Sequence, residues 1–103
     1  MLTVYKYPFS IADDFKMSFP KGVRLLCVQT QQEKPCLWAL VDPDVKPTVV
    51  VKFHLAGTGH PINIPAQNLS YLDTFQMYDG SLVFHLFIIN DGTNPNIEKG
   101  EIK

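Results

Sequence analysis

The sequence has few cysteines, no excess of charge of either sign and no long apolar run. Two cysteines among 103 residues, Cys27 and Cys36, are too few for a disulfide framework, so we expect both to stay thiols. Nine basic side chains against ten acidic ones leave a net charge of −1, which argues against binding to DNA or RNA polymers. The longest apolar run, Leu82 to Ile89, contains His85 and is far shorter than the roughly 18 residues of a membrane-spanning helix.

The N-terminal segment, Met1 to Pro8, also lacks the basic head and apolar stretch of a secretory signal. We therefore expect a single intracellular domain, located in a cytoplasm and not in a membrane. With 46% hydrophobic residues, a chain of this length can build a core without a metal or a disulfide. We expect no cofactor.

Short segments rich in Val, Ile, Phe and Tyr are separated by prolines and glycines, and no window has the apolar spacing of a helix. The pattern predicts an all-β fold, either a small antiparallel sandwich or a partly open barrel of about seven short strands. We expect this single domain to span residues 1–89, followed by a polar and flexible tail over residues 90–103. The expected strands are residues 2–7, 14–19, 23–30, 36–42, 48–55, 70–77 and 81–89.

Several of these strands carry apolar side chains on both faces. Val23, Leu25 and Cys27 alternate with Leu26 and Val28, and the segments 37–41 and 82–89 are apolar at both parities. A domain this small covers one face of a sheet with its own second layer but seldom both. Because monomers rarely expose large apolar patches, we infer a homo-oligomer, a dimer or a tetramer. The alternative is a thick core that the segment 56–69 covers.

The segment Gly57-Thr58-Gly59-His60-Pro61 is the richest candidate for a ligand site. Two glycines allow the backbone to approach a ligand closely or to turn its N–H groups toward an anion. The Thr58 hydroxyl and the His60 ring add polar groups, and Lys52 and His54, which share one face of the preceding strand, add positive potential. The alternative is an ordinary glycine-rich turn, because no helix start follows as in the phosphate-binding motifs.

Other constellations are weaker. The histidines His54, His60 and His85 lack metal-ligand spacing, so we expect no metal site. No nucleophile elbow is present, and we expect no enzymatic activity. The aromatic side chains of Tyr7 and Trp38 are suited to stacking on a nucleobase, but such residues are equally common in cores and interfaces.

Five segments together resemble a small family of proteins of unknown function carried by bacteriophages and prophages. The Trp38 and His60 segments are the most specific of them, and the resemblance covers nearly the whole chain before Asn90. The segments are Lys6-Tyr7-Pro8, Pro20-Lys21-Gly22, Pro35 to Pro43, Gly57 to Pro61, and Tyr71 to Gln76 with Val83 to Phe87.

Small phage β proteins that form symmetric oligomers include sponges, which sequester the cyclic nucleotide signals of host defence, for example the cyclic dinucleotides of CBASS immunity. The resemblance thus implies an anti-defence protein in the host bacterial cytoplasm that captures a cyclic nucleotide without cleaving it. A protein-binding inhibitor or adaptor and a minor virion component are the alternatives. The expected ligand-binding residues are Gly57, Thr58, Gly59, His60, Trp38, Lys52 and Tyr7.

Overall fold

The computed structural model of the chain describes residues 1–92, 94 and 97–99. Its regular elements are strands and a single turn of 3₁₀ helix, and no α-helix occurs in this part of the chain. The all-β prediction is therefore confirmed. The elements are β1 (Thr3–Pro8), β2 (Asp14–Pro20), β3 (Arg24–Gln31), β4 (Lys34–Val41), β5 (Thr48–Gly57), η1 (Ala66–Asn68), β6 (Leu69–Met77), β7 (Leu82–Ile89) and β8 (Glu98–Lys99).

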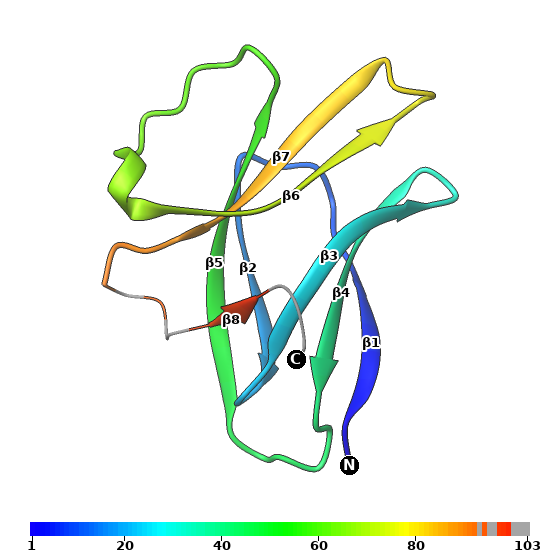
Figure 1. The fold of residues 1–103 in the computed structure, drawn as a ribbon, viewed down its shortest axis with the longest axis vertical. Helices are drawn as coiled ribbons and strands as arrows, with labels where there is room; N and C mark the ends of the chain where they lie inside the picture. The colour runs from blue at the N-terminus through cyan, green and yellow to red at the C-terminus, as the bar shows by residue number, and fades with distance from the viewer. Residues whose placement is uncertain (93, 95–96, 100–103) are drawn as a thin grey trace.

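The strands form two sheets that pack face to face (Figure 1). Sheet A has the strand order β1-β4-β3-β8, and sheet B has the order β2-β5-β7-β6. Neighbouring strands are antiparallel except for the two-residue β8, which pairs with β3 in parallel. The predicted sandwich is confirmed, and the seven predicted strands match β1 to β7 with small shifts at their ends.

The two sheets approach each other where β3 of sheet A meets β6, the edge strand of sheet B. There the Asp73 carboxylate of β6 accepts a hydrogen bond from the backbone N–H of Val28 in β3, at 2.7 Å. A side chain thus satisfies a donor that a neighbouring strand would otherwise satisfy. Because β3 and β6 do not pair as strands at this seam, the structure is not a closed barrel. It is a sandwich whose two sheets are joined along one side.

Aromatic and aliphatic side chains from both sheets fill the space between them. Phe19 and Phe53 of sheet B and Leu25 and Leu37 of sheet A are fully buried. Phe53 also stacks with Phe15, their ring centroids lying 5.3 Å apart. As predicted from the alternation along β2, Phe15, Met17 and Phe19 all face this core.

The side chains of β3 do not alternate between the two faces as predicted, because the strand contains a β-bulge. The pairing of β3 with β4 shifts between Leu25 and Cys27, so that Leu25 and Val28 both point into the core. Strict alternation had placed these two side chains on opposite faces. A bulge adds one residue to a strand and reverses the facing of all residues beyond it. Part of the apolar excess in β3 is therefore explained within one chain.

The described part of the C-terminal segment contacts both sheets of the sandwich. The Asn94 side chain accepts a hydrogen bond from the Lys52 N–H and donates to the Lys52 and Ile89 carbonyls, where β5 and β7 diverge. Further along, β8 pairs with Arg24 and Leu25 of β3. The predicted flexible tail at 90–103 includes residues 93, 95–96 and 100–103, which lie outside the described residues, and its flexibility stays a prediction.

The described residues also include no helix that is long and apolar enough to cross a membrane.

Candidate functional site

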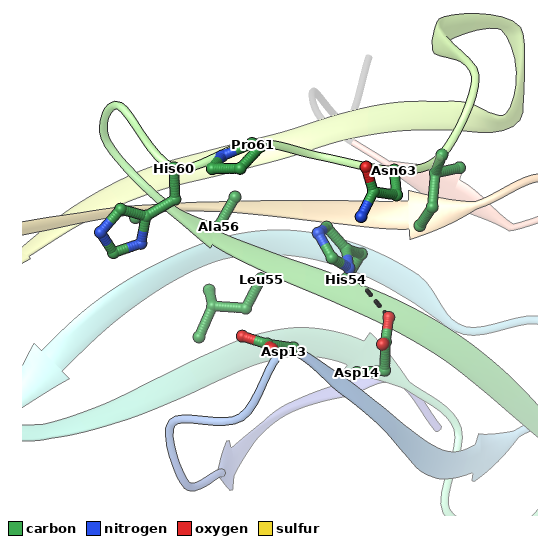
Figure 2. Close-up of a pocket in the computed structure, with 10 residues that line it drawn as sticks. Asp13, Asp14, His54, Leu55, Ala56, His60, Pro61 and Asn63 are labelled. Carbon is green, nitrogen blue, oxygen red and sulfur yellow. Dashed lines mark hydrogen bonds and ion pairs between the residues drawn. The ribbon is translucent and has the colours of Figure 1, made fainter.

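A hollow lies where the chain leaves β5 and folds back over it. After Gly57, the Thr58 N–H donates to the Val83 carbonyl of β7, and the His60 N–H donates back to the Gly57 carbonyl. This tight turn reverses the chain, with Gly59 at a φ of 85° that suits glycine. Figure 2 shows the segment beyond His60 running above β5, with Asn63 extending toward His54.

The hollow has a volume of about 450 Å³, which is in the range of small-molecule sites. Its polar side chains come from the start of β2, from β5 and from the returning segment, while leucine, alanine, proline and isoleucine supply apolar surface. It is lined by Asp13, Asp14, His54, Leu55, Ala56, Gly57, His60, Pro61, Asn63 and Ile64.

Strand register explains why acid and imidazole meet here. Asp14 is the partner of His54 in the β2–β5 ladder, and the carboxylate lies 2.8 Å from His54 Nδ1 (Figure 2). The His54 side chain is only 12% exposed, whereas that of Asp14 is 65% exposed. A well-fixed imidazole therefore holds a carboxylate at the mouth of the hollow, where it can accept hydrogen bonds from a ligand.

A pair of lysines follows the acid–imidazole pair. Lys16 lies opposite Lys52 in the same ladder, two residues from Asp14 and His54. Residues two apart in a strand point to the same face, about 7 Å apart. The outer face of β2 and β5 thus presents carboxylate and ammonium groups side by side.

The absence of a side chain at Gly57 lets the His60 ring lie close to the backbone. A Cβ atom on Gly57 would lie 2.8 Å from His60 Nδ1, closer than such atoms approach in proteins. The ring thus packs over the Gly57 backbone, which holds His60 at the wall of the hollow. The glycines were predicted to let a ligand approach the backbone closely, whereas the group that approaches Gly57 here is a side chain of the same chain.

His85 is the centre of a hydrogen-bonded row on the outer face of sheet B. Its Nε2 atom lies 2.7 Å from the Thr58 hydroxyl and its Nδ1 atom 2.9 Å from the Thr74 hydroxyl, which in turn lies 2.7 Å from the Tyr71 hydroxyl. Thr58 also reaches the Val83 carbonyl at 3.3 Å. All four contacts are satisfied together when Thr58 donates to Val83 and His85 donates from Nε2 to Thr58.

The structure brings together only some of the residues predicted to bind a ligand. Gly57 and His60 line the hollow, Thr58 and Gly59 form the turn beside it, and Lys52 is on the adjoining strand face. The N–H groups of Thr58 and His60 both donate to carbonyls of the chain, so they do not form the anion-binding concavity that the sequence suggested.

Trp38 and Tyr7 lie in the other sheet. Tyr7 packs against Phe19, their ring centroids 4.8 Å apart, at the margin of the core. Trp38 lies in β4 opposite Lys6 and Cys27, with its indole N–H buried and without an acceptor among the described residues. Within one chain, neither aromatic ring belongs to the hollow.

Three polar residues of the hollow, Asp13, Asp14 and Asn63, were not predicted to lie at the site, and His54 was predicted only as a source of positive potential beside Lys52. The two aspartates resemble ordinary turn residues before a strand, and Asn63 lies in an irregular segment. Only the β2–β5 register, which local sequence does not specify, brings Asp14 to His54. The spacing of prolines at 61 and 65 was the one available signal of a segment that folds back.

Across the described residues, no three His, Cys, Asp or Glu side chains gather closely enough to hold a metal ion. Both cysteines are free thiols, Cys27 half-buried and Cys36 buried.

Comparison with known proteins identifies a family for nearly the whole chain. Residues 1–96 match the family described as Domain of unknown function (DUF7352), and the chain belongs to this family. No curated protein and no solved structure matches the chain.

Proposed function

We propose that this member of the DUF7352 family captures a small nucleotide without cleaving it, with the base in the hollow and the phosphate at Lys16 and Lys52. The single observation that carries the proposal is the order of groups along the β2–β5 ladder. Asp14 and His54 come first, and the lysine pair follows two residues later. A ligand that fits both must have hydrogen-bond donors at one end and negative charge at the other.

Nucleotides have this distribution. The edge of a guanine or adenine base carries N–H groups. The carboxylates of Asp13 and Asp14 and the amide oxygen of Asn63 can accept hydrogen bonds from these groups. The apolar surface of Leu55, Pro61 and Ile64 suits the faces of the base. A phosphate attached to that base extends toward the lysines, which are about 7 Å along the strand.

Capture without chemistry agrees with the hydrogen bonds around Thr58. In the arrangement that satisfies every group, the Thr58 hydroxyl donates to a carbonyl and His85 Nε2 already carries a proton. That imidazole atom is not available to take a proton from Thr58, as a general base must. The proposed role is therefore stoichiometric binding.

The biological setting of the proposal comes from the resemblance to phage-borne proteins. A protein that binds a cyclic dinucleotide in the cytoplasm of an infected bacterium would lower the concentration of a defence signal. The proposal includes assembly into a homo-oligomer, which supplies further binding sites and covers apolar surface. On sheet A, Val4 is 50% exposed, and the neighbouring Trp38 and Leu40 are half-buried.

The direct experiment is binding measured by calorimetry and thermal shift against cyclic di- and trinucleotides, mononucleotides and the corresponding nucleosides. We expect at least one nucleotide to bind and to be recovered unchanged after the protein is denatured. Recovery of a hydrolysed product, formed in excess over the protein, would make the protein an enzyme. Absence of binding across the whole panel would refute the proposal.

Two variants distinguish the ends of the site. D14N removes a carboxylate charge and weakens nucleoside and nucleotide alike, by about tenfold. K16A weakens only the nucleotide, by a similar factor, because the nucleoside has no phosphate. The matched control is K46A, which removes the same charge from the loop before β5, beyond the end of the strand that is farther from His54. Equal losses for K16A and K46A would show that only net charge matters.

A further inference from the structure

The outer edge of β1 carries backbone groups that no strand of the described chain pairs. β1 pairs with β4 alone, with Tyr5 opposite Ala39 and Tyr7 opposite Leu37. The Phe9 N–H donates to the Pro35 carbonyl, which identifies the odd-numbered residues as those whose backbone groups face β4. The N–H and C=O groups of Val4 and Lys6 therefore point away from the sheet. In Figure 1, β1 lies at the margin of the molecule with no strand beyond it.

Several exposed apolar side chains lie on and just before this strand. Leu2 is 64% exposed, Val4 50% and Tyr5 45%. A proline, Pro8, ends the strand, and Lys6 is its one charged side chain. An exposed apolar edge of this kind is a template for another strand.

We propose that β1 pairs antiparallel with β1 of a second copy of this chain, about a two-fold axis at Tyr5. This inference gives the assembly in the proposed function its contact strand. In this register Val4 and Lys6 of each copy exchange backbone hydrogen bonds with Lys6 and Val4 of the other. Leu2 lies opposite Pro8, which lacks an N–H but still accepts through its carbonyl.

The side chains select this register and this partner. A two-fold axis at Lys6 would place two lysines opposite each other, and an axis at Val4 would leave Pro8 without a partner residue in β1. With the axis at Tyr5, each lysine faces a valine, and the two Tyr5 rings meet as a cross-strand aromatic pair. The outer faces of the two copies of sheet A then form one surface, on which Val4, Trp38 and Leu40 of both copies are continuous.

The backbone bonds are tested with K6P and K6A, using sedimentation equilibrium. Proline removes the outward N–H of Lys6, which has no role in the β1–β4 ladder, whereas alanine keeps that N–H and removes the same side chain, including its bond to Gln31. We expect K6P to weaken the dimer at least tenfold relative to K6A. Equal dimerisation of K6P and K6A, or a wild-type protein that stays monomeric at every concentration, overturns the inference. A dimer unaffected by K6P would use another surface and would leave the proposed assembly intact.

The register is tested with V4E and V4K, which remains informative if K6P does not fold. Both variants replace the same exposed valine by a charged side chain. In the proposed register V4E faces Lys6 of the second copy, while V4K places two cations together at both ends of the pair. We expect V4E to dimerise about tenfold more tightly than V4K, with the difference reduced by salt. Equal affinities overturn the register, because an axis at Val4 would make both variants self-repelling. Nucleotide binding, measured in parallel, reports on the hollow separately.

Discussion

The outer faces of the two sheets differ although both sheets share one core. On sheet B, polar side chains form ordered contacts, from Asp14 and His54 to the row centred on His85, beside exposed apolar side chains such as Val50. On sheet A, Val4, Trp38 and Leu40 are apolar and partly exposed, and the buried Trp38 N–H has no acceptor among the described residues. The two proposals above assign a small ligand to sheet B and a second copy of the chain to sheet A.

The connections between strands account for part of this difference. The strands of sheet A that are consecutive in sequence, β3 and β4, are joined by a short hairpin at Gln32 and Glu33. In sheet B the connection from β5 to β6 spans residues 58–68 and returns over β5. A connection of this length brings polar groups from outside the sheet to its surface, as long loops commonly do at binding sites.

The largest effect on stability is expected at the seam that holds the two sheets together. D73A leaves the Val28 N–H without its acceptor and should lower the free energy of unfolding by about 2 kcal/mol. D73N keeps an acceptor oxygen at the same place and should lose less than half as much. Urea unfolding of both variants measures the difference. Equal losses would mean that the carboxylate charge, and not the hydrogen bond across the seam, stabilises the sandwich.

Replacing one residue on each outer face by phenylalanine compares the two faces directly. H85F removes the hydrogen bonds to Thr58 and Thr74 and should lower stability by about 1 kcal/mol. W38F removes a buried donor that has no acceptor, which should raise the stability. The smaller phenylalanine ring packs less well and should lower the stability by a similar amount, so we expect a net change near zero. Thermal unfolding at matched protein concentration measures both. A larger loss for W38F than for H85F would contradict the assignment of polar order to sheet B.

A smaller effect is expected at the tip of the β3–β4 hairpin. Gln32 and Glu33 have φ angles of 52° and 64°, which residues other than glycine and asparagine adopt with strain. The Glu33 carboxylate accepts a hydrogen bond from the Tyr78 N–H of the β6–β7 turn, so this strained tip connects the hairpins of both sheets. Q32N should raise stability by about 0.5 kcal/mol and leave that contact in place. The control Q29N, within β3, should bring no gain in the same urea measurement.

The sequence predicted the strands well because local pattern determines them. Prolines, glycines and the alternation along Phe15, Met17 and Phe19 are all visible in the chain. The β3 bulge was not visible, because a bulge depends on which residue of the neighbouring strand lies opposite. The site was predicted only in part, because some of its residues are brought together by strand pairing and not by the local sequence. Gly57 and His60 are neighbours in sequence, whereas Asp14 meets His54 only through pairing across 40 residues.

The smallest effect concerns the thiol at the seam. Partial burial raises the pKa of Cys27 above the ordinary cysteine value, and the charge of Asp73 raises it further. Because the folded state favours the neutral thiol, the stability it contributes is present below the ordinary cysteine pKa and is lost as the pH rises through the pKa of Cys27.

We expect alkylation of Cys27 by iodoacetamide to have its midpoint at a higher pH than that of a free cysteine. D73N should lower this midpoint only partly, since burial is the larger cause. C27S leaves Cys36, which is 1% exposed, as the remaining thiol and gives the background rate. A Cys27 midpoint at or below that of free cysteine would show that the β3–β6 seam is more open to water than the Val28–Asp73 contact implies.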